Sequence, residues 1–557
     1  MRILRNSLIF LLLVFFFLFL IVPLYSVVEE GLRPDYLWEA LRNPVYLEGL
    51  WNAFLIGLTV TTIVALIAIP LAVMADRYEF AGKSWVNGLI LLPLILPPFV
   101  GALGFQQVFG QLGAFNALLT HLGFFDAGLG PDWLGSNRFA VVCLIEALHL
   151  YPILYLNLST VLANIDPALH DAARNLGATP WRRFRQITLP LVRPGMFAGG
   201  IIVFIWSFTE LGTPLMLGYT RVAPVQIFRG VTELGSNPIA YSLVVILLVI
   251  SAGLYLLSHY LFGESDAGAV SKGSSGDATV KLRGWRSALP GVAFLAVTAV
   301  AVLPHLAIIL LSASQDWYGT LLPSAFTSGH YSDALGHAFV VPSIINSLKF
   351  ALTATVLAIG AGFLTALIVV RWKPRGWQAI DVLSMMPLAV PGIILAFGYL
   401  SMATRYEWMR QLFDPVENPT FLLIIAYAVR RMPYVVRAGV AGLQQTPIDL
   451  EQAAAGLGAS PWMVLRRITF PLIVANLIAG GVFAFSFSML EVSDSLILAQ
   501  KTAFFPITRA IYELSQILGS GHYIACAFGV WAMVFLAVSL FAVTRILGRK
   551  MGALFRF

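Results

Sequence analysis

Two acidic residues stand inside long apolar runs of this 557-residue sequence, and they are its first candidates for chemistry. Glu210 lies in the segment SFTELGTP and Glu491 in SMLEVSD, and each follows a serine, Ser207 or Ser488, by three positions. A charged side chain at the middle of a membrane helix costs at least ~2.5 to 3.5 kcal/mol on insertion, so such residues mark substrate or ion pathways by default. The alternative is that each glutamate pairs with a neighbouring helix and only fixes packing, and both interpretations stay open.

A second group of ionisable residues lies in the apolar run before each glutamate. Glu146 and His149 are three positions apart, which places them on one face of a helix. Arg430 and Arg431 occupy the matching run later in the chain, and we expect an arginine here to form an ion pair with one of the two glutamates. Metal ligation by Glu146 and His149 is the weaker alternative, and we predict neither a metal site nor a catalytic residue. The candidates for a pathway across the membrane are Glu146, Ser207, Glu210, Arg430, Arg431, Ser488 and Glu491.

The composition places these residues in a membrane protein. Hydrophobic residues make up 59% of the chain and charged residues 11%, with a mean hydropathy of +0.83. Soluble domains carry roughly 25% charged residues, so most of this chain must lie in lipid. The net charge of +7 is then expected to face the cytoplasm and anionic lipid, not nucleic acid. Cys143 and Cys526 lie in apolar runs and are expected to be small buried hydrophobes.

Twelve apolar runs are long enough to be transmembrane helices, so the sequence predicts an all-α polytopic protein. They lie near 7–27, 52–75, 86–110, 138–163, 193–217, 240–262, 288–313, 342–370, 378–402, 419–442, 473–498 and 521–546. The first run is longer than the core of a signal peptide and lacks a small-residue cleavage site, so we expect a retained helix. Residues 263–287 are polar and rich in Gly and Ser, which is typical of a flexible linker. We predict six helices in 1–262, a cytoplasmic linker, and six helices in 288–557.

The two halves are repeats of one another. At an offset of 294 the matching pairs are Asn52 with Asn346, Arg77 with Arg371, Pro93 with Pro387, Pro97 with Pro391, and Gly104 with Gly398. From the fourth helix onward the offset is 281, which pairs Glu210 with Glu491. Six helices per half is an even number, so the halves are parallel repeats. The repeated prolines break the third helix of each half, and lining a cavity is favoured slightly over kinked packing.

One polar island occurs in each half, DAARNLGATPWRRFRQITLP at 171–190 and QAAAGLGASPWMVLRRITFP at 452–471. Gly177 and Gly458 permit a sharp turn after a helix of small residues, and Pro180 and Pro461 suit the first turn of a second short helix. The pattern predicts a helix–turn–helix along the membrane face, and duplication favours this over a basic loop anchored to lipid headgroups. With the N-terminus inside, most of the 35 Lys and Arg residues, both islands and the C-terminus are cytoplasmic.

The islands resemble the EAA loop of ABC-importer permease subunits. The matching residues are Asp171, Ala172, Ala173, Gly177, Ile187, Leu189 and Pro190, then Gln452, Ala453, Ala454, Gly458, Ile468, Phe470 and Pro471. The departures are Asp171 and Gln452 where the family usually has Glu, and Phe470 for Leu; Glu451, one position early, is a candidate substitute. The resemblance implies a type I importer fold whose loops, 164–192 and 444–472, couple the permease to two separate ATP-binding cassette subunits.

Further partners follow from the same resemblance. It implies a periplasmic or lipid-anchored solute-binding protein and a bacterial inner membrane, and the distribution of Lys and Arg places both termini in the cytoplasm. No cofactor is expected on this chain, because ATP binds the partner subunit. The nearest phosphate-loop sequence, Gly82-Lys83-Ser84, has Arg77 where a Walker A motif needs Gly, so the chain itself is not expected to be an enzyme.

The solute is predicted from a second resemblance. The segment TELGTPLMLG resembles the fifth helix of ferric-iron importer permeases, often fused two-half chains, whereas LEVSDSLILA fits that pattern less well. Ferric iron is therefore the expected solute, with thiamine, polyamine, phosphonate, and sulfate or molybdate as alternatives. A major-facilitator secondary transporter is the alternative from another class, but it does not explain two helix–turn–helix islands. A membrane enzyme is a third, for which no nucleophile–base set is present.

Overall fold

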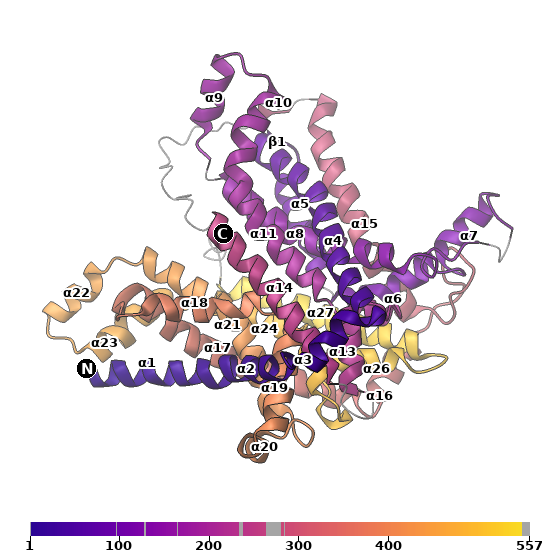
Figure 1. Cartoon of the computed structure of the whole chain (residues 1–557). Coiled ribbons are helices and arrows are strands. Elements are labelled where there is room, and N and C mark those ends of the chain that lie inside the picture. The colour runs from indigo at the N-terminus through magenta and orange to yellow at the C-terminus, as the bar shows by residue number, and fades with distance from the viewer. Residues whose placement is uncertain are drawn as a thin grey trace. The chain divides into compact units, whose positions relative to one another are not determined.

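Almost all of the described chain is helical (Figure 1). The computed structural model describes residues 2–95, 97–126, 130–163, 165–232, 238–262, 280–282 and 284–547. Most of the predicted linker, residues 263–279 and 283, lies outside the described residues. Two short strands, β1 (Tyr78–Glu79) and β2 (Val280–Lys281), pair in parallel with Tyr78 opposite Val280.

The helical segments that make up the predicted apolar runs fall where the sequence places them. They are α1 (Arg2–Phe16), η1 (Phe17–Ile21) and α2 (Val22–Gly31), then α4 (Pro44–Arg77), α5 (Lys83–Leu89), η2 (Leu92–Ile95), α6 (Pro98–Phe109), α8 (Arg138–Ala163), α11 (Leu189–Phe208), α14 (Ile239–Phe262), α15 (Ala288–Ala313), α17 (Val340–Leu367), α18 (Trp377–Ala389), α19 (Gly392–Arg405), α21 (Thr420–Gln445), α24 (Phe470–Met489) and α27 (Gly521–Leu547). The shorter helices are α3 (Pro34–Arg42), α7 (Ala114–His121), α9 (Pro167–Asn175), α10 (Pro180–Arg183), η3 (Phe184–Thr188), α12 (Gly212–Met216), α13 (Ala223–Thr232), η4 (Gly284–Ser287), α16 (Gly329–Gly336), η5 (Ile368–Trp372), α20 (Glu407–Phe413), α22 (Asp449–Gly456), α23 (Pro461–Val464), η6 (Leu465–Thr469), α25 (Ser493–Leu498), η7 (Thr502–Phe504) and α26 (Ile507–Ser515).

The number of membrane spans agrees with a polytopic permease. Among the described residues, nine helices are long and apolar enough to cross a membrane, or eleven when each of two bent pairs counts as one span. The remaining predicted run, near 419–442, is the 26-residue helix α21. Its three arginines, Arg430, Arg431 and Arg437, keep its apolarity below that of the other spans.

Prolines break the third helix of each half, as the sequence predicts. In the first half Lys83–Leu94 and Pro98–His121 meet at 94°, and in the second half Trp377–Ala389 and Gly392–Arg405 meet at 105°. Pro97 and Pro391 are the N-cap residues of α6 and α19, and both have extended backbone. Since proline has no N–H to donate and pushes its predecessor out of the helical region, the helix restarts in a new direction.

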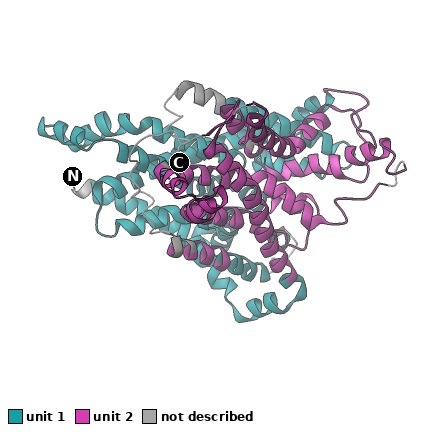
Figure 2. Cartoon of the chain, turned by 90° about the horizontal axis from the view of Figure 1, so that it is seen from above, with its two compact units in different colours: residues 1–47, 226–248, 329–556 teal, residues 48–225, 249–328, 557 magenta. Residues whose placement is uncertain are grey.

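Two compact units make up the chain, and they cut across the sequence repeat (Figure 2). Unit 1 contains residues 1–47, 226–248 and 329–556, and unit 2 contains residues 48–225 and 249–328. The first helix of the first half, α1 to α2, therefore belongs with the second-half helices. Conversely α15, the first helix of the second half, belongs with the first-half helices. The halves have exchanged their first helices.

A glycine against a proline carbonyl marks this exchange in each unit. In unit 2, where α6 packs on α15, a Cβ on Gly104 would lie 2.2 Å from the carbonyl oxygen of Pro304. In unit 1, where α19 packs on α2, a Cβ on Gly398 would lie 2.9 Å from the carbonyl oxygen of Pro23. Only glycine permits such close backbone approach. Gly104 and Gly398 match in the repeat, and Pro23 and Pro304 each lie in the first helix of a half, so the same kind of contact forms twice.

The repeated asparagines hold the start of the second helix in each half. Asn52 Nδ2 donates to the carbonyl oxygen of Arg221 at 2.8 Å in unit 2. Asn346 Nδ2 donates to the carbonyl oxygens of Ala503 and Phe505 at 2.9 and 3.2 Å in unit 1. Both sets of acceptors lie in the segment that follows the fifth helix of the half, so this tether is also duplicated.

We predict that Gly104→Ala lowers the apparent melting temperature of the detergent-purified chain by several degrees. The added methyl group would force the backbones of α6 and α15 apart, and overpacking of this kind costs about 1–3 kcal/mol. Gly101→Ala, one turn earlier on α6, is the matched control because nothing lies within 4 Å of its Cβ. Equal melting temperatures for the two variants would contradict the close helix contact.

Candidate functional site

Each predicted island begins with a helix that ends in the same hydrogen-bonded turn. After α9, the N–H of Gly177 bonds the carbonyl of Arg174, and the N–H of Ala178 bonds the carbonyl of Ala173, both at 2.9 Å. After α22 the two corresponding bonds around Gly458 are both 3.0 Å. This is a Schellman turn, and it needs a left-handed residue; the two glycines have φ of +77° and +86°. The predicted role of glycine as the turning residue is confirmed.

The second helix of each island begins as predicted. Thr179 Oγ1 accepts a hydrogen bond from the N–H of Arg182, and Ser460 Oγ accepts one from the N–H of Met463, both at 3.3 Å. A proline at the first helical position follows each capping residue, where its missing N–H leaves no partner unsatisfied. The helix–turn–helix is therefore present in both halves, and Figure 1 shows α9 beside α10 and α22 beside α23.

The second helix is not a separate short helix along the membrane face, which corrects that part of the prediction. In the first half α10 continues through the π turn η3 into α11, so that Pro180–Met216 forms one span. The second half does the same through η6 into α24. Pro190 or Pro471 follows the end of each π turn by two residues. A π turn shifts the hydrogen-bond register by one residue just before a residue that cannot donate, and the helix continues.

Large apolar side chains project from both turns. Leu176 is 87% exposed and Leu457 90%, while Trp181 is 69% exposed and Trp462 61%. Both pairs are related by the offset of 281. These exposed apolar groups therefore stand at matching places on the two polar loops. The residues assigned to ATPase coupling are likewise exposed or half-buried: Asp171, Ala172, Ala173, Gly177, Pro190, Gln452, Ala453, Ala454, Gly458 and Pro471.

A cluster of four charged side chains, three buried and one half-buried (Arg430), lies in unit 1, where the fifth helix of the second half breaks between α24 and α25. Arg430 Nη1 lies 2.5 Å from Glu491 Oε1 and 3.1 Å from Asp494 Oδ2. Arg431 Nη2 forms an ion pair with Glu491 Oε2. The predicted ion pair between an arginine of this helix and Glu491 is confirmed. Asp494, fully buried, was not predicted, although it follows Glu491 by three residues in the same polar segment.

The matching break in unit 2, between α11 and α12, has different chemistry. Glu146, buried, accepts a hydrogen bond from Thr213 Oγ1 at 2.6 Å. Glu210 Oε1 accepts from the N–H groups of Gly212 and Thr213 at 3.0 and 3.4 Å, so this carboxylate caps α12. The positions that match the two arginines hold His149 and Leu150. One half thus balances two cations against two anions, whereas the other places two carboxylates on a shared threonine.

The two candidate serines are both buried, but their hydroxyl groups differ. Ser207 Oγ donates to the carbonyl oxygen of Val203 in its own helix at 2.8 Å. Ser488 Oγ has no hydrogen-bond partner among the described residues. A role for either serine in a pathway stays a prediction, as does the facing of Glu210 and Glu491 across one.

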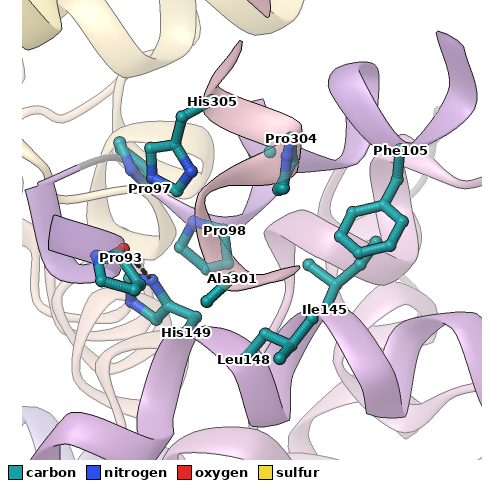
Figure 3. Close-up of a pocket in the computed structure, with 11 residues that line it drawn as sticks. Pro93, Pro97, Pro98, Phe105, Ile145, Leu148, His149, Ala301, Pro304 and His305 are labelled. Carbon is teal, nitrogen blue, oxygen red and sulfur yellow. Dashed lines mark hydrogen bonds between the residues drawn. The ribbon is translucent and has the colours of Figure 1, made fainter. Parts of the chain in front are cut away.

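The prolines of the first half line a small cavity (Figure 3). Its volume of about 20 Å³ has room for about one water molecule. His149 points toward Pro93, with 2.9 Å between its Nδ1 and the proline carbonyl oxygen, and His305 lies at the other end of the cavity. Pro93 and Pro97 line this water-sized void, whereas the lining of a transport cavity by the repeated prolines stays a prediction. In the described residues no group of three or more His, Cys, Asp or Glu side chains is arranged to hold a metal ion. Cys143 and Cys526 are buried free thiols, as expected.

We predict that Glu491→Gln destabilises the chain strongly, because it leaves two arginines with one carboxylate. Breaking a buried ion pair costs about 3–5 kcal/mol, whereas replacing both partners by apolar residues is often neutral or stabilising. The double variant Arg431→Met/Glu491→Leu should therefore recover most of the lost melting temperature. Glu48→Gln, which removes the exposed ion pair of Glu48 with Arg221, is the control with little expected effect. A loss for Glu491→Gln no larger than for Glu48→Gln would contradict a structural ion pair.

The chain is similar in sequence to named transport permeases. It is 27% identical over 485 residues to the putative ferric transport system permease protein FbpB 1 of Haemophilus influenzae, covering 84% of this chain and 71% of that protein. It is 27% identical over 540 residues to the ferric transport system permease protein FbpB of Actinobacillus pleuropneumoniae, covering 92% and 71%. The molybdenum transport system permease protein ModB of Haemophilus influenzae is 31% identical over 219 residues, covering 38% of this chain and 92% of that one.

A solved structure and a protein family complete the comparison. A chain of a bacterial ABC transporter involved in the import of the acidic polysaccharide alginate aligns with 47% of this chain and 98% of its own, at 19% identity and a TM-score of 0.34. This likeness is too weak to bear on the fold. Residues 68–262 and 358–553, well over half of the chain, each match one family, once in each sequence half. The chain therefore belongs to the family of binding-protein-dependent transport system inner membrane components, with two family domains fused in one polypeptide.

Proposed function

We propose that the chain is the membrane permease of an ATP-driven importer, powered by two separate ATP-binding cassette subunits that dock on its two islands. The observation that carries this proposal is the duplicated loop, with its left-handed glycine and its exposed Leu and Trp. A cleft in each ATPase subunit would cover these apolar side chains. Their exposure to water is unfavourable, so docking would stabilise the assembly. A solute-binding protein delivers the solute at the other face. Because both halves of the chain belong to this family, the alternative of a major-facilitator secondary transporter is dropped.

The proposed solute is ferric iron. The two relatives described above that cover most of the chain are named as ferric transport permeases. Glu146 and Glu210 offer carboxylate oxygens, which suit a hard cation. An oxyanion such as molybdate would instead favour uncompensated arginines, and Arg430 and Arg431 are paired with carboxylates. Thiamine, polyamine, phosphonate and sulfate remain alternatives, which uptake assays with the cognate binding protein distinguish.

The proposed orientation places both termini, both islands and the linker in the cytoplasm. The basic residues carry this proposal, since Lys and Arg accumulate in cytoplasmic segments. Within it, α9 to α10 and α22 to α23 lie where soluble ATPase subunits can reach them. Accessibility of single cysteines introduced at Leu176 and Leu457 to a membrane-impermeant thiol reagent tests the orientation: labelling only after the membrane is opened supports it, and labelling of intact cells contradicts it.

We predict that Gly177→Val and Gly458→Val each reduce ATP-dependent uptake in proteoliposomes by about tenfold or more, the effect of ~1.4 kcal/mol. A β-branched residue is strained at these positive φ values, and its side chain would stand in the docking surface. The chain has matched controls in Gly82→Val and Gly376→Val, whose φ values are +80° and +82° and whose Cβ positions are equally open.

The controls separate docking from backbone strain. All four variants strain a left-handed turn, so their melting temperatures should fall by similar amounts. Only the island variants should lose co-purification with the ATPase subunit and uptake. Equal loss of uptake in island and control variants would show that strain alone is responsible, and would count against docking at the islands.

We predict that Glu210→Gln and Glu146→Gln reduce uptake of radioactive ferric iron by about tenfold or more while the chain still assembles with the ATPase subunit, because each removes a carboxylate from the proposed pathway. Loss of assembly in these variants would indicate a packing role instead. In the second half, uptake by the Arg431→Met/Glu491→Leu variant decides between the same two roles. Uptake near that of the unaltered chain assigns this ion pair to packing, and its absence in a stable variant assigns it to the pathway.

A further inference from the structure

One repeated arginine reaches the coupling loop of its own half in each unit. Arg371 lies in η5, at the cytoplasmic end of α17 in the proposed orientation, and Arg77 ends α4 at the matching place. Arg371 Nε donates to Glu451 Oε1 at 2.9 Å, and its Nη2 donates to the carbonyl oxygen of Thr446 at 2.9 Å. Arg77 Nη2 donates instead to Thr188 Oγ1, at 2.6 Å.

The guanidinium of Arg371 joins three helices of unit 1. Thr446 is the C-cap of α21, and Glu451 lies in the first turn of α22, so one side chain holds both sides of the bend that leads into the second island. Arg371 is 11% exposed and Glu451 18%, which shields their ion pair from solvent. Lys373, left-handed with φ of +38°, closes η5 by donating from its N–H to the carbonyl of Ile368 at 2.8 Å. The backbone that presents Arg371 is thus fixed.

The first island lacks the ionic partner. The position that matches Glu451 at the offset of 281 is His170. Burial, followed by the charges of Arg77 and Arg183, lowers the pKa of the His170 imidazole, so this side chain is neutral at pH 7 and offers no negative charge to Arg77. The hydrogen bond from Arg77 to the hydroxyl of Thr188 takes its place. The two islands are therefore tethered by different chemistry.

We propose that Arg371 is a positioning residue whose ion pair with Glu451 clamps the second coupling loop to the end of α17, so that loop and helix move together when the ATPase subunits close. The motion rests on the proposed function, but the clamp itself does not. Because the Glu451 carboxylate is engaged inside the chain, it does not replace the acidic docking residue missing at Gln452. The docking contact of this island then depends on its exposed Leu457 and Trp462.

Hydrogen–deuterium exchange of the purified chain tests the clamp without any partner. Glu451→Gln and Arg371→Gln should each speed amide exchange across α22 by about fivefold or more, the effect of ~1 kcal/mol. The charge-swapped variant Arg371→Glu/Glu451→Arg should restore slower exchange. Glu79→Gln, which breaks the more exposed cytoplasmic pair of Glu79 with Lys83 at 3.2 Å, is the control and should leave α22 unchanged. Unchanged exchange in the single variants, or a swap that exchanges as fast as they do, overturns the clamp.

Coupling is then measured in proteoliposomes that contain the ATPase subunit and the liganded binding protein. The single variants should still co-purify with the ATPase and hydrolyse ATP. Their ratio of solute transported to ATP hydrolysed should fall by about threefold or more. The swap and the conservative Arg371→Lys should recover part of this ratio. An unaltered ratio in variants whose α22 exchange has risen overturns the positioning role. Absence of ATP-dependent uptake by the unaltered chain overturns the proposed function instead, and the exchange result still decides the clamp.

Discussion

The close approach of a glycine in the third helix to a proline carbonyl in a first helix is the contact on which both compact units depend. Gly104 meets Pro304 in one unit, and Gly398 meets Pro23 in the other. The approach requires the third helix to restart in a new direction, which the breaks before α6 and α19 provide. The small cavity in unit 2 lies at this crossing, since Pro304 and Gly101 both line it. Break, crossing and cavity therefore belong to one arrangement.

Duplication has preserved the backbone of the chain more closely than its charges. The Schellman turns, the π turns before proline and the asparagine tethers recur in both halves with nearly the same hydrogen bonds. Some buried polar positions recur, such as Ser207 and Ser488, but others do not: Glu146 and Thr213 in the first half stand where Tyr427 and Asp494 stand in the second. Since a buried charge must be paired or hydrogen-bonded, each half satisfies its own set with local partners. Backbone geometry and electrostatics have diverged at different rates within one chain.

Much of the fold followed from local pattern, and the remainder depended on information that a pattern does not hold. Apolar run length located the helices, prolines located the breaks, and glycine with a capping residue located the island turns. The pairing of Glu491 with an arginine followed from the cost of unpaired charge in lipid. Asp494 and Thr213 were missed because their burial depends on tertiary packing. Asp494 is buried where α25 packs on α21, and Thr213 where α12 packs on α8. The exchange of first helices could not be predicted, because a repeat with two equivalent copies is equally consistent with either pairing.

The continuous helix through Pro190 and Pro471 was missed for a different reason. Proline is ordinarily read as a helix boundary, and no residue pattern identifies the π turn that precedes Pro190 and Pro471. The candidate site, like the fold, was predicted from the sequence only in part. Sequence supplied the islands and the buried glutamates, whereas the arginine that ties one island to its helix emerged only from the folded contacts.

The exchange of first helices has a consequence for biogenesis. When the ribosome has completed the first half, that half lacks the helix that completes its unit, because α15 has yet to be synthesised. Meanwhile α1 and α2 have been inserted without the α19 surface that Gly398 provides. Neither unit can finish packing until the later helices enter the bilayer, so maturation of the two halves is concerted. If the chain were cut at the linker, each fragment would reach its native structure only when the other fragment is also present.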